Sequence, residues 1–314
     1  MIFSDDSIYN GMNPMNTSII EAEITKNFKN DQQARRLFHG RGGCFDGFKD
    51  LAIDFIPPYV LIECYEDDDE SRPIKIKNIL LEHFETSIEG IFWRNRKKSL
   101  VYQALRGKLP EKHLLWENNL CYEVTFKDNQ NHGFFMDMRP GRELLQSICA
   151  GKKVLNLFAY TCSFSVVAIK HGAAGVINMD MKKNFLNQGI KNHLINHLSV
   201  QNVLNMPHDI MKSLGAIRKK GPFDIVIIDP PSSQKQHFQI EKDYRKIFKR
   251  LPEWLKEGGE VIACLNSPFW DQDFLINIKN ECYPLLQLKK ILGAAEEFKE
   301  KDPRLGLKII WFSL

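Results

Sequence analysis

Three aspartates stand at the ends of three apolar runs in the second half of the chain. Asp180 follows VINM, Asp209 follows VLNMPH and Asp229 follows FDIVII. One such aspartate is common, because it often caps the following helix. Three in successive strand–helix units converge on one crevice beyond the carboxyl ends of a parallel sheet. Asp180 lies 24 residues after Asn156, a spacing typical of an acid that binds ribose hydroxyls.

Asp229 also begins a stiff motif, Asp229-Pro230-Pro231. Proline donates no backbone hydrogen bond and restricts the residue before it to extended conformations. The resulting turn can hold its carbonyl groups and the Asp229 carboxyl against a planar substrate. A rigid loop without a catalytic role is the alternative, but the position after a strand favours a catalytic site at these three residues.

The first strand–helix turn of this region contains no glycine. It is Asn156-Leu-Phe-Ala-Tyr-Thr161-Cys-Ser. A pyrophosphate needs close approach of the backbone, which glycines normally allow. The turn therefore disfavours a dinucleotide-dependent dehydrogenase and favours a nucleoside cofactor without phosphates, such as S-adenosylmethionine.

Alternating strands and helices position these residues. Apolar runs at 154–158, 176–179, 203–206, 223–228, 261–265 and 307–312 alternate with helical stretches that end near His171 and Leu194, lie near Leu214 and begin at Lys242. Continuously apolar strands separated by helices predict a mostly parallel sheet that is covered on both faces. We expect this α/β domain over residues 120–314, entered through a hairpin at 120–138 made of Leu120–Phe126 and His132–Met138.

The N-terminal half has a mixed pattern. Residues 1–31 predict a loosely held arm with a short helix around Ile19 to Phe28. Residues 32–119 predict a small α+β domain, since an apolar strand at Val60–Tyr65 precedes a helical pattern over Ile76–Ile88.

Composition excludes several classes of protein. The chain has 314 residues, a formal net charge of +4 and seven cysteines without a C-x-x-C pair. The charge permits an RNA partner without arguing for one. The cysteine pattern predicts neither a disulfide framework nor a metal site, so a reducing cytoplasm is the expected location. We expect no signal peptide and no membrane span, and we leave a homodimer open.

The motifs together resemble a known family. They are His132-Gly-Phe-Phe-Met-Asp-Met-Arg-Pro-Gly-Arg142, Val154-Leu-Asn-Leu-Phe-Ala-Tyr-Thr161, Asp180 with Asn192, Asp229-Pro-Pro231 and Leu305-Gly-Leu-Lys308. In this order they resemble the class I S-adenosylmethionine-dependent methyltransferases. More narrowly, they resemble the bacterial large-subunit ribosomal RNA methyltransferases that modify cytosine at carbon 5 or guanine at N7. The resemblance implies a Rossmann-like, seven-stranded, mostly parallel sheet.

The resemblance also implies roles for individual residues. Asp180 is expected to hold the ribose, Asp209 to face the adenine, and Arg139 to lie near the cofactor or to couple the hairpin to the core. Where the family carries glutamine or histidine, this chain has Met138. The full set of expected cofactor-binding residues is Arg139, Asn156, Phe158, Tyr160, Thr161, Asp180, Met181, Asp209 and Asp229.

The target atom depends on the strand after Asp229. Methylation of a pyrimidine at carbon 5 requires a thiolate that first adds to the ring. Cys264 is the one cysteine placed for that step, but as a strand residue it is more simply a buried apolar side chain. By this resemblance, the members of the family that modify cytosine carry a cysteine where this chain has Asn266. The resemblance therefore favours a guanine nitrogen as the methyl acceptor. Asp229, Pro230, Pro231 and Asn266 are the expected catalytic residues.

Three features are candidates for RNA contacts, each with a structural alternative. Trp93-Arg94-Asn-Arg96-Lys97-Lys98, followed by Tyr102 and Arg106, mixes aromatic and basic residues. Phe269 and Trp270 could stack on an extruded base or lie in a core. Lys242, Arg245, Lys246 and Lys249 form one helical face that could contact phosphates or only solvent.

Two rival functions stay open. The first is a methyltransferase that acts on a protein or a small molecule, because fold does not fix substrate. The second is a non-catalytic RNA-binding protein that retains a degenerate fold. Cofactor binding would exclude the second, and association with ribosomes would argue against the first.

Overall fold

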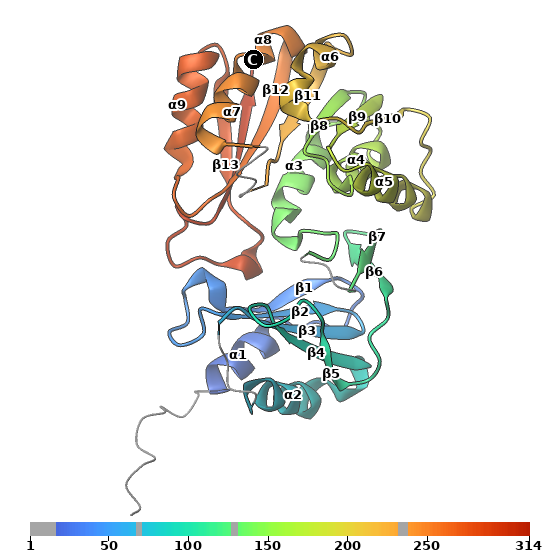
Figure 1. Cartoon of the computed structure of the whole chain (residues 1–314), viewed down its shortest axis with the longest axis vertical. Coiled ribbons are helices and arrows are strands. Elements are labelled where there is room, and N and C mark those ends of the chain that lie inside the picture. Colours follow the sequence, from blue (N-terminus) through green and yellow to red (C-terminus); the bar gives the residue numbers. More distant parts are fainter. Residues whose placement is uncertain (1–16, 67–70, 127–130, 232–237) are drawn as a thin grey trace, which may run out of the picture.

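The protein consists of two lobes with a β-hairpin between them (Figure 1). The computed structural model describes residues 17–66, 71–126, 131–231 and 238–314. The smaller lobe holds the N-terminal sheet, and the larger lobe holds the sheet of the second half of the chain.

The smaller lobe contains a five-stranded sheet and two helices. Its strands are β1 (Arg35–His39), β2 (Leu51–Ile56), β3 (Tyr59–Cys64), β4 (Gly90–Asn95) and β5 (Gln103–Arg106), in the order β1-β2-β3-β4-β5. Helix α2 (Ser71–Phe84) makes the crossover between the parallel strands β3 and β4. This arrangement is the α+β pattern that the sequence predicted.

Helix α1 (Thr17–Asn27) confirms the short helix expected near Ile19. The expectation of a loose arm is wrong for this part of the chain, because Ile20 and Ile24 are fully buried in the core of the smaller lobe. Residues 1–16 of the arm lie outside the described residues.

The larger lobe contains the predicted seven-stranded sheet, in the order β10-β9-β8-β11-β12-β14-β13. Only β14 runs antiparallel to its neighbours. The strands are β8 (Lys153–Leu157), β9 (Gly175–Met179), β10 (Val203–Met206), β11 (Phe223–Ile228), β12 (Leu255–Asn266), β13 (Gln287–Leu292) and β14 (Leu307–Ser313). The helices are α3 (Arg139–Ile148), α4 (Ser163–Lys170), α5 (Lys183–Ile195), α6 (Leu214–Arg218), α7 (Ile240–Phe248), α8 (Leu251–Trp254) and α9 (Gln272–Cys282).

Both faces of this sheet are buried, as the apolar strands predicted. In β11, Val226 and Ile228 belong to one core cluster, while Ile225 and Ile227 belong to the cluster on the opposite face. Side chains alternate across a strand, so a strand covered on both sides is apolar along most of its length. The Rossmann-like α/β fold class is thus confirmed. Strand β13, with its lysines and exposed side chains, was missed because it lies at the edge of the sheet.

The hairpin between the lobes differs from the one expected at 120–138. Strand β7 (Leu120–Thr125) pairs with β6 (Lys112–Glu117), which precedes it, and not with residues 132–138. Met136–Met138 instead form a 3-10 turn that leads into α3. The turn at Asn118 and Asn119 has positive φ values, which asparagine tolerates. The domain boundary expected at residues 119 and 120 therefore falls inside the hairpin.

The buried face of the hairpin joins the two lobes. Leu115 and Tyr122 share a core cluster with Phe92 of the smaller lobe and with Val166 and Val167 of α4. Removing any of these side chains would leave a cavity in the contact between the lobes.

Candidate active site cleft

A cleft of about 1080 Å³ lies at the carboxyl ends of β8, β9, β10, β11 and β12, beside the hairpin and residues 131–138. This is the place where ligands bind in open α/β sheets. Most of the predicted site residues line it. They are Phe158, Tyr160, Thr161, Asp180, Met181, Asp209, Asp229, Pro230, Pro231 and Asn266.

The glycine-free loop after β8 reaches an unusual conformation. Phe158, Tyr160 and Cys162 have φ values of 59°, 46° and 64°, in the left-handed region that glycine ordinarily occupies. Such residues cost free energy and persist where the surrounding structure fixes them. The loop thus makes, without glycine, a tight turn of the kind that glycine ordinarily allows.

Several contacts hold this loop in place. The Thr161 hydroxyl donates to the Gly133 carbonyl at 2.6 Å, and the Asn192 side chain donates to the Thr161 carbonyl at 3.0 Å. Asn192 also accepts a hydrogen bond from the Glu123 backbone N–H, so it joins the loop to β7. An added Cβ at Gly189 would lie 2.4 Å from the Cys162 sulfur, which explains why α5 has glycine at that point.

Asp180 and Asp209 both lie in the cleft and both accept backbone hydrogen bonds. Asp180 accepts from Tyr160 N at 3.0 Å and from Lys182 N at 2.9 Å, and burial raises its pKa. Asp209 accepts from Met211 N and so caps the short turn that follows β10. Each carboxylate retains acceptor capacity for a ligand, since an ionised carboxylate has about four lone-pair sites.

A second carboxyl shares the floor of the cleft with Asp229. Asp137 and Asp229 both line the cleft, and burial raises the pKa of each. Burial, with the nearby Asp137 charge, raises the pKa of Asp229 to about 7. Arg142 also lines the floor and is fully buried, where it pairs with Glu117 on the hairpin and donates to the Phe135 carbonyl at 2.9 Å. Asp229 is therefore divided between its acid and carboxylate forms near neutral pH.

Two expected cofactor residues lie away from the cleft. Asn156 is buried within β8, where its side chain donates to the Asn178 side chain at 2.9 Å. Arg139 pairs with Glu297 and does not line the cleft. Contact of these two residues with the cofactor stays a prediction. The other expectation for Arg139 was that it couples the hairpin to the core, but its partner Glu297 belongs to a turn that packs on β1 of the smaller lobe.

The segment after β12 is held by a buried lysine. The Lys308 ammonium donates to the carbonyls of Ser267, Trp270 and Arg304 at 2.8, 2.7 and 3.0 Å, and burial lowers its pKa. Asn266, at the end of β12, is exposed and lines the cleft. Lys308 thus fixes the chain directly after a predicted catalytic residue.

Phe269 and Trp270 differ in their surroundings. Phe269 is 86% exposed, whereas Trp270 packs against Phe274 with ring centroids 4.5 Å apart. Neither lines the cleft. Stacking of Phe269 on a base stays a prediction.

Cys264 lies in the core and not in the cleft. It is 1% exposed, and burial raises the pKa of its thiol well above the ordinary value. None of the described residues that line the cleft is a cysteine. The interpretation of Cys264 as a buried apolar side chain is confirmed.

The predicted RNA-binding segment around Trp93 is largely internal. Arg94 is 1% exposed and donates to Glu63 at 2.8 Å, and Arg96 contacts the same carboxylate. Burial alone would raise the pKa of Glu63, but its contacts with His132, Arg94 and Arg96 hold it well below the usual range. Trp93 and Tyr102 are buried as well.

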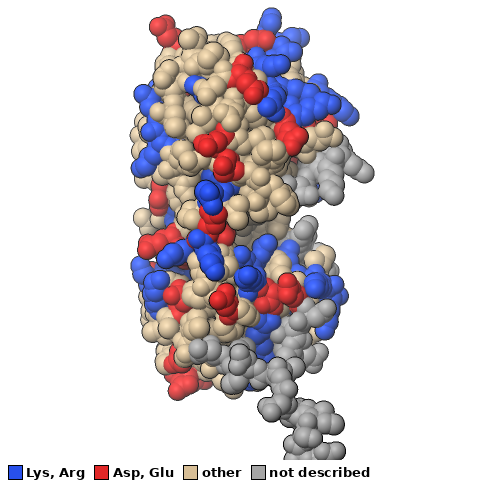
Figure 2. Space-filling model, turned by 90° about the vertical axis from the view of Figure 1, so that its left-hand side faces the viewer, with Lys and Arg blue, Asp and Glu red and all other residues tan. Residues whose placement is uncertain are grey.

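The prediction that Arg94 contacts a phosphate is therefore wrong, because its guanidinium neutralises the buried carboxylate of Glu63. Lys97 and Lys98 are the exposed basic residues of the Trp93–Lys98 run. On the predicted helical face, Lys242 and Lys249 are exposed, while Arg245 pairs with Glu281 and Lys246 with Asp243. On the face shown in Figure 2, basic and acidic side chains are interspersed.

Sequence reasoning assigned no role to Asp137 and Arg142, although both stand in the quoted motif before the α/β domain. The signal was their type: two charged residues beside glycines and aromatics in a segment that leads into a sheet. Across the described ranges, no three His, Cys, Asp or Glu side chains gather to hold a metal ion. No helix of the described chain is long and apolar enough to span a membrane.

Comparison with known proteins places this cleft in context. A family model for S-adenosylmethionine-dependent methyltransferases matches residues 35–313. A putative ribosomal RNA large subunit methyltransferase of Bacillus subtilis, YwbD, is 29% identical over 254 residues, which are 76% of this chain and 62% of that protein. The ribosomal RNA large subunit methyltransferase K/L of Syntrophotalea carbinolica is 31% identical over 206 residues, or 64% of this chain and 28% of that protein.

Solved structures of methyltransferases are also similar to this chain. A putative methyltransferase, SMU.776, complexed with S-adenosylhomocysteine has a TM-score of 0.85 and 26% identity, with 97% of this chain and 83% of that chain covered. A putative methyltransferase from Streptococcus mutans has a TM-score of 0.84, 25% identity and the same coverage. The chain spans less than two thirds of the length of the curated relatives named above.

Proposed function

Because the chain belongs to the family of S-adenosylmethionine-dependent methyltransferases, we propose that it methylates a base of RNA, with ribosomal RNA as the substrate and a guanine nitrogen as the acceptor. The ribosomal RNA methyltransferases to which it is similar support the choice of RNA. The absence of a cysteine from the described lining of the cleft supports nitrogen over a pyrimidine carbon.

The residues of the cleft fit the cofactor. When bound, S-adenosylmethionine supplies an electrophilic methyl group on its sulfonium. Phe158 offers an aromatic wall, Asp180 a carboxylate for the ribose hydroxyls, and Asp209 an acceptor for the adenine amino group. No glycine-rich phosphate cradle is required, because this cofactor has no phosphate.

The floor of the cleft fits a guanine. The edge of guanine that carries N7 also carries O6, and both are hydrogen-bond acceptors. The Asp229 carboxyl, with a pKa of about 7, donates a hydrogen bond to O6 in its acid form. Asn266 supplies further amide donors from the next strand. The N7 lone pair then needs only alignment with the methyl group, so catalysis comes from positioning.

The absence of a cysteine from the described lining is the observation that carries this choice of atom. The test is mass spectrometry of the nucleosides in ribosomal RNA incubated with the protein and S-adenosylmethionine. We expect a methylated guanine, and Cys264→Ala should retain most of the activity. A methylated cytosine, or a covalent adduct with 5-fluorocytosine RNA that Cys264→Ala abolishes, would contradict the proposal.

A further inference from the structure

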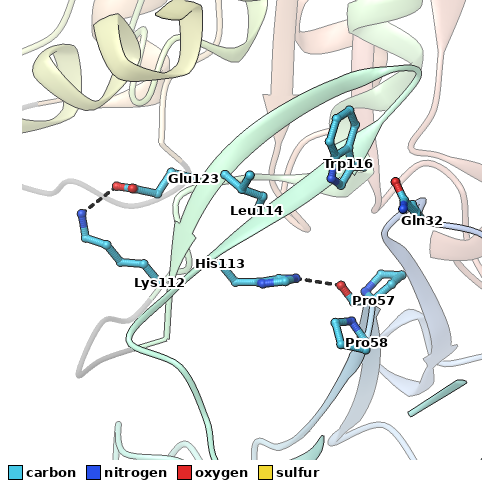
Figure 3. A pocket seen from close by; sticks show the side chains of 8 residues that line it. All are labelled: Gln32, Pro57, Pro58, Lys112, His113, Leu114, Trp116 and Glu123. Carbon is cyan, nitrogen blue, oxygen red and sulfur yellow. Dashed lines mark hydrogen bonds and ion pairs between the residues drawn. The ribbon is translucent and has the colours of Figure 1, made fainter. Parts of the chain in front are cut away.

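A second groove lies beside the cleft, between the hairpin and the smaller lobe. It has a volume of about 600 Å³ and is lined by Gln32, Pro57, Pro58, Lys112, His113, Leu114, Trp116 and Glu123. Figure 3 shows Leu114 and Trp116 on the hairpin, with Gln32, Pro57 and Pro58 on neighbouring segments. Lys112 and Glu123 line both this groove and the cleft, so the two hollows lie side by side with this ion pair between them.

The apolar character of the groove follows from the alternation of side chains along β6. Lys112 and Leu114 are exposed and Trp116 is partly exposed, whereas the intervening Leu115 is buried. Leu114 is 40% exposed, a large value for leucine on a strand. Among large side chains, tryptophan commonly stacks on bases when it is accessible. The strand therefore presents an aliphatic and an aromatic side chain outward, next to a prolyl turn.

The groove is also built rigidly. His113 bonds the Pro57 carbonyl at 2.7 Å, and the Lys112 ammonium donates to Glu123 at 2.8 Å. The backbone of β6 is tied to the smaller lobe, since Ala34 N donates to the Trp116 carbonyl at 2.9 Å. The backbone of β7 is tied to α5 through Asn196, which accepts from Cys121 N at 2.9 Å.

We propose that this groove binds the nucleotide next to the methylated base, with its base stacked against Trp116 and Leu114. The inference rests on RNA being the substrate. A base that enters the cleft is drawn out of its stack, and the neighbouring base loses a stacking partner at the same time. The side chains of Trp116 and Leu114, in the groove beside the cleft, replace that partner. Stacking, unlike charge, suits this surface, because its lysine is already paired with Glu123.

The test compares Trp116→Ala and Trp116→Phe with a matched control, Leu204→Ala. Leu204 is 42% exposed on β10, and it lines neither hollow. Binding of a fluorescein-labelled single-stranded RNA is followed by anisotropy over a range of salt concentrations, and S-adenosylmethionine binding by calorimetry. Trp116→Ala should weaken RNA binding roughly tenfold, the effect of losing one stacked base. Trp116→Phe should restore most of the affinity.

Two further readouts separate stacking from other roles. The salt dependence of RNA binding should be the same in Trp116→Ala and the wild type, because no phosphate contact is lost. Affinity for S-adenosylmethionine should also be unchanged, which shows that the variant is folded. Equal RNA affinity in Trp116→Ala and Leu204→Ala would overturn the proposal and point to another occupant, such as a protein segment.

The failure of this inference is distinct from a failure of the proposed function. If the wild-type protein methylates RNA and Trp116→Ala does so with the same KM for RNA, only the nucleotide groove is refuted. If the wild-type protein neither methylates RNA nor binds the probe, the RNA substrate itself is refuted, and the groove with it.

Discussion

The Asp229→Asn substitution should make the protein more stable above neutral pH. Burial and the neighbouring Asp137 raise the pKa of Asp229 from 3.8 to about 7. A carboxyl whose folded-state pKa is raised binds its proton more tightly in the folded protein than in the unfolded chain. Its contribution to stability is therefore lost as pH rises from about 3.8, where the unfolded chain ionises, to about 7, where the folded protein does.

The magnitude follows from the size of the shift. At ~1.36 kcal/mol per pKa unit, a shift of ~3 units corresponds to ~4 kcal/mol of destabilisation above pH 7. Asp229 lines an open cleft, and solvent screening should reduce this to roughly 2 kcal/mol. Asparagine carries no charge at any of these pH values, so the variant escapes this cost.

Urea denaturation at about pH 5 and about pH 8.5 measures the effect. The stability advantage of Asp229→Asn should grow by roughly 1–2 kcal/mol between the two. Asp224→Asn is the control: burial there is outweighed by Lys256 and the Lys153 N–H, which lower the pKa of Asp224. That variant should gain nothing at high pH. An Asp229→Asn advantage that is absent, or independent of pH, would refute a raised pKa in the cleft.

Three further perturbations test the cleft. Asp180→Ala should weaken S-adenosylmethionine binding tenfold or more, since a charge-assisted hydrogen bond contributes ~1.5–3 kcal/mol; unchanged affinity by calorimetry would place the cofactor elsewhere. Gly189→Ala puts a methyl group 2.4 Å from the Cys162 sulfur. It should therefore destabilise the protein by ~1–3 kcal/mol in denaturation experiments. Unchanged stability would mean that the loop around Cys162 is not tightly held. Lys308→Met leaves three carbonyls without their hydrogen-bond donor. It should lower the free energy of unfolding by ~2 kcal/mol or more and speed proteolysis near residues 267–270. Unaltered proteolysis would argue against Lys308 as the anchor of that segment.

Local patterns in the sequence were enough to predict six of the seven strands and the edge of the sheet at which the site lies. Strands buried on both faces are nearly continuous apolar runs, so β8, β9 and β11 were recognisable from their composition. A residue that directly follows a strand has its position set by the strand, which is why Asp180 and Asp229 were placed in one cleft before the structure was known.

Only the tertiary structure decided properties that depend on contacts between distant segments. Arg94 is basic in the sequence, but Glu63, on a neighbouring strand, buries and neutralises it. The raised pKa of Asp229 likewise depends on burial and on Asp137, which precedes the sheet in the chain and reaches the cleft only through folding. The ion pair of Arg94 and the coupling of Asp229 to Asp137 join segments far apart in the chain, so no local pattern encodes them.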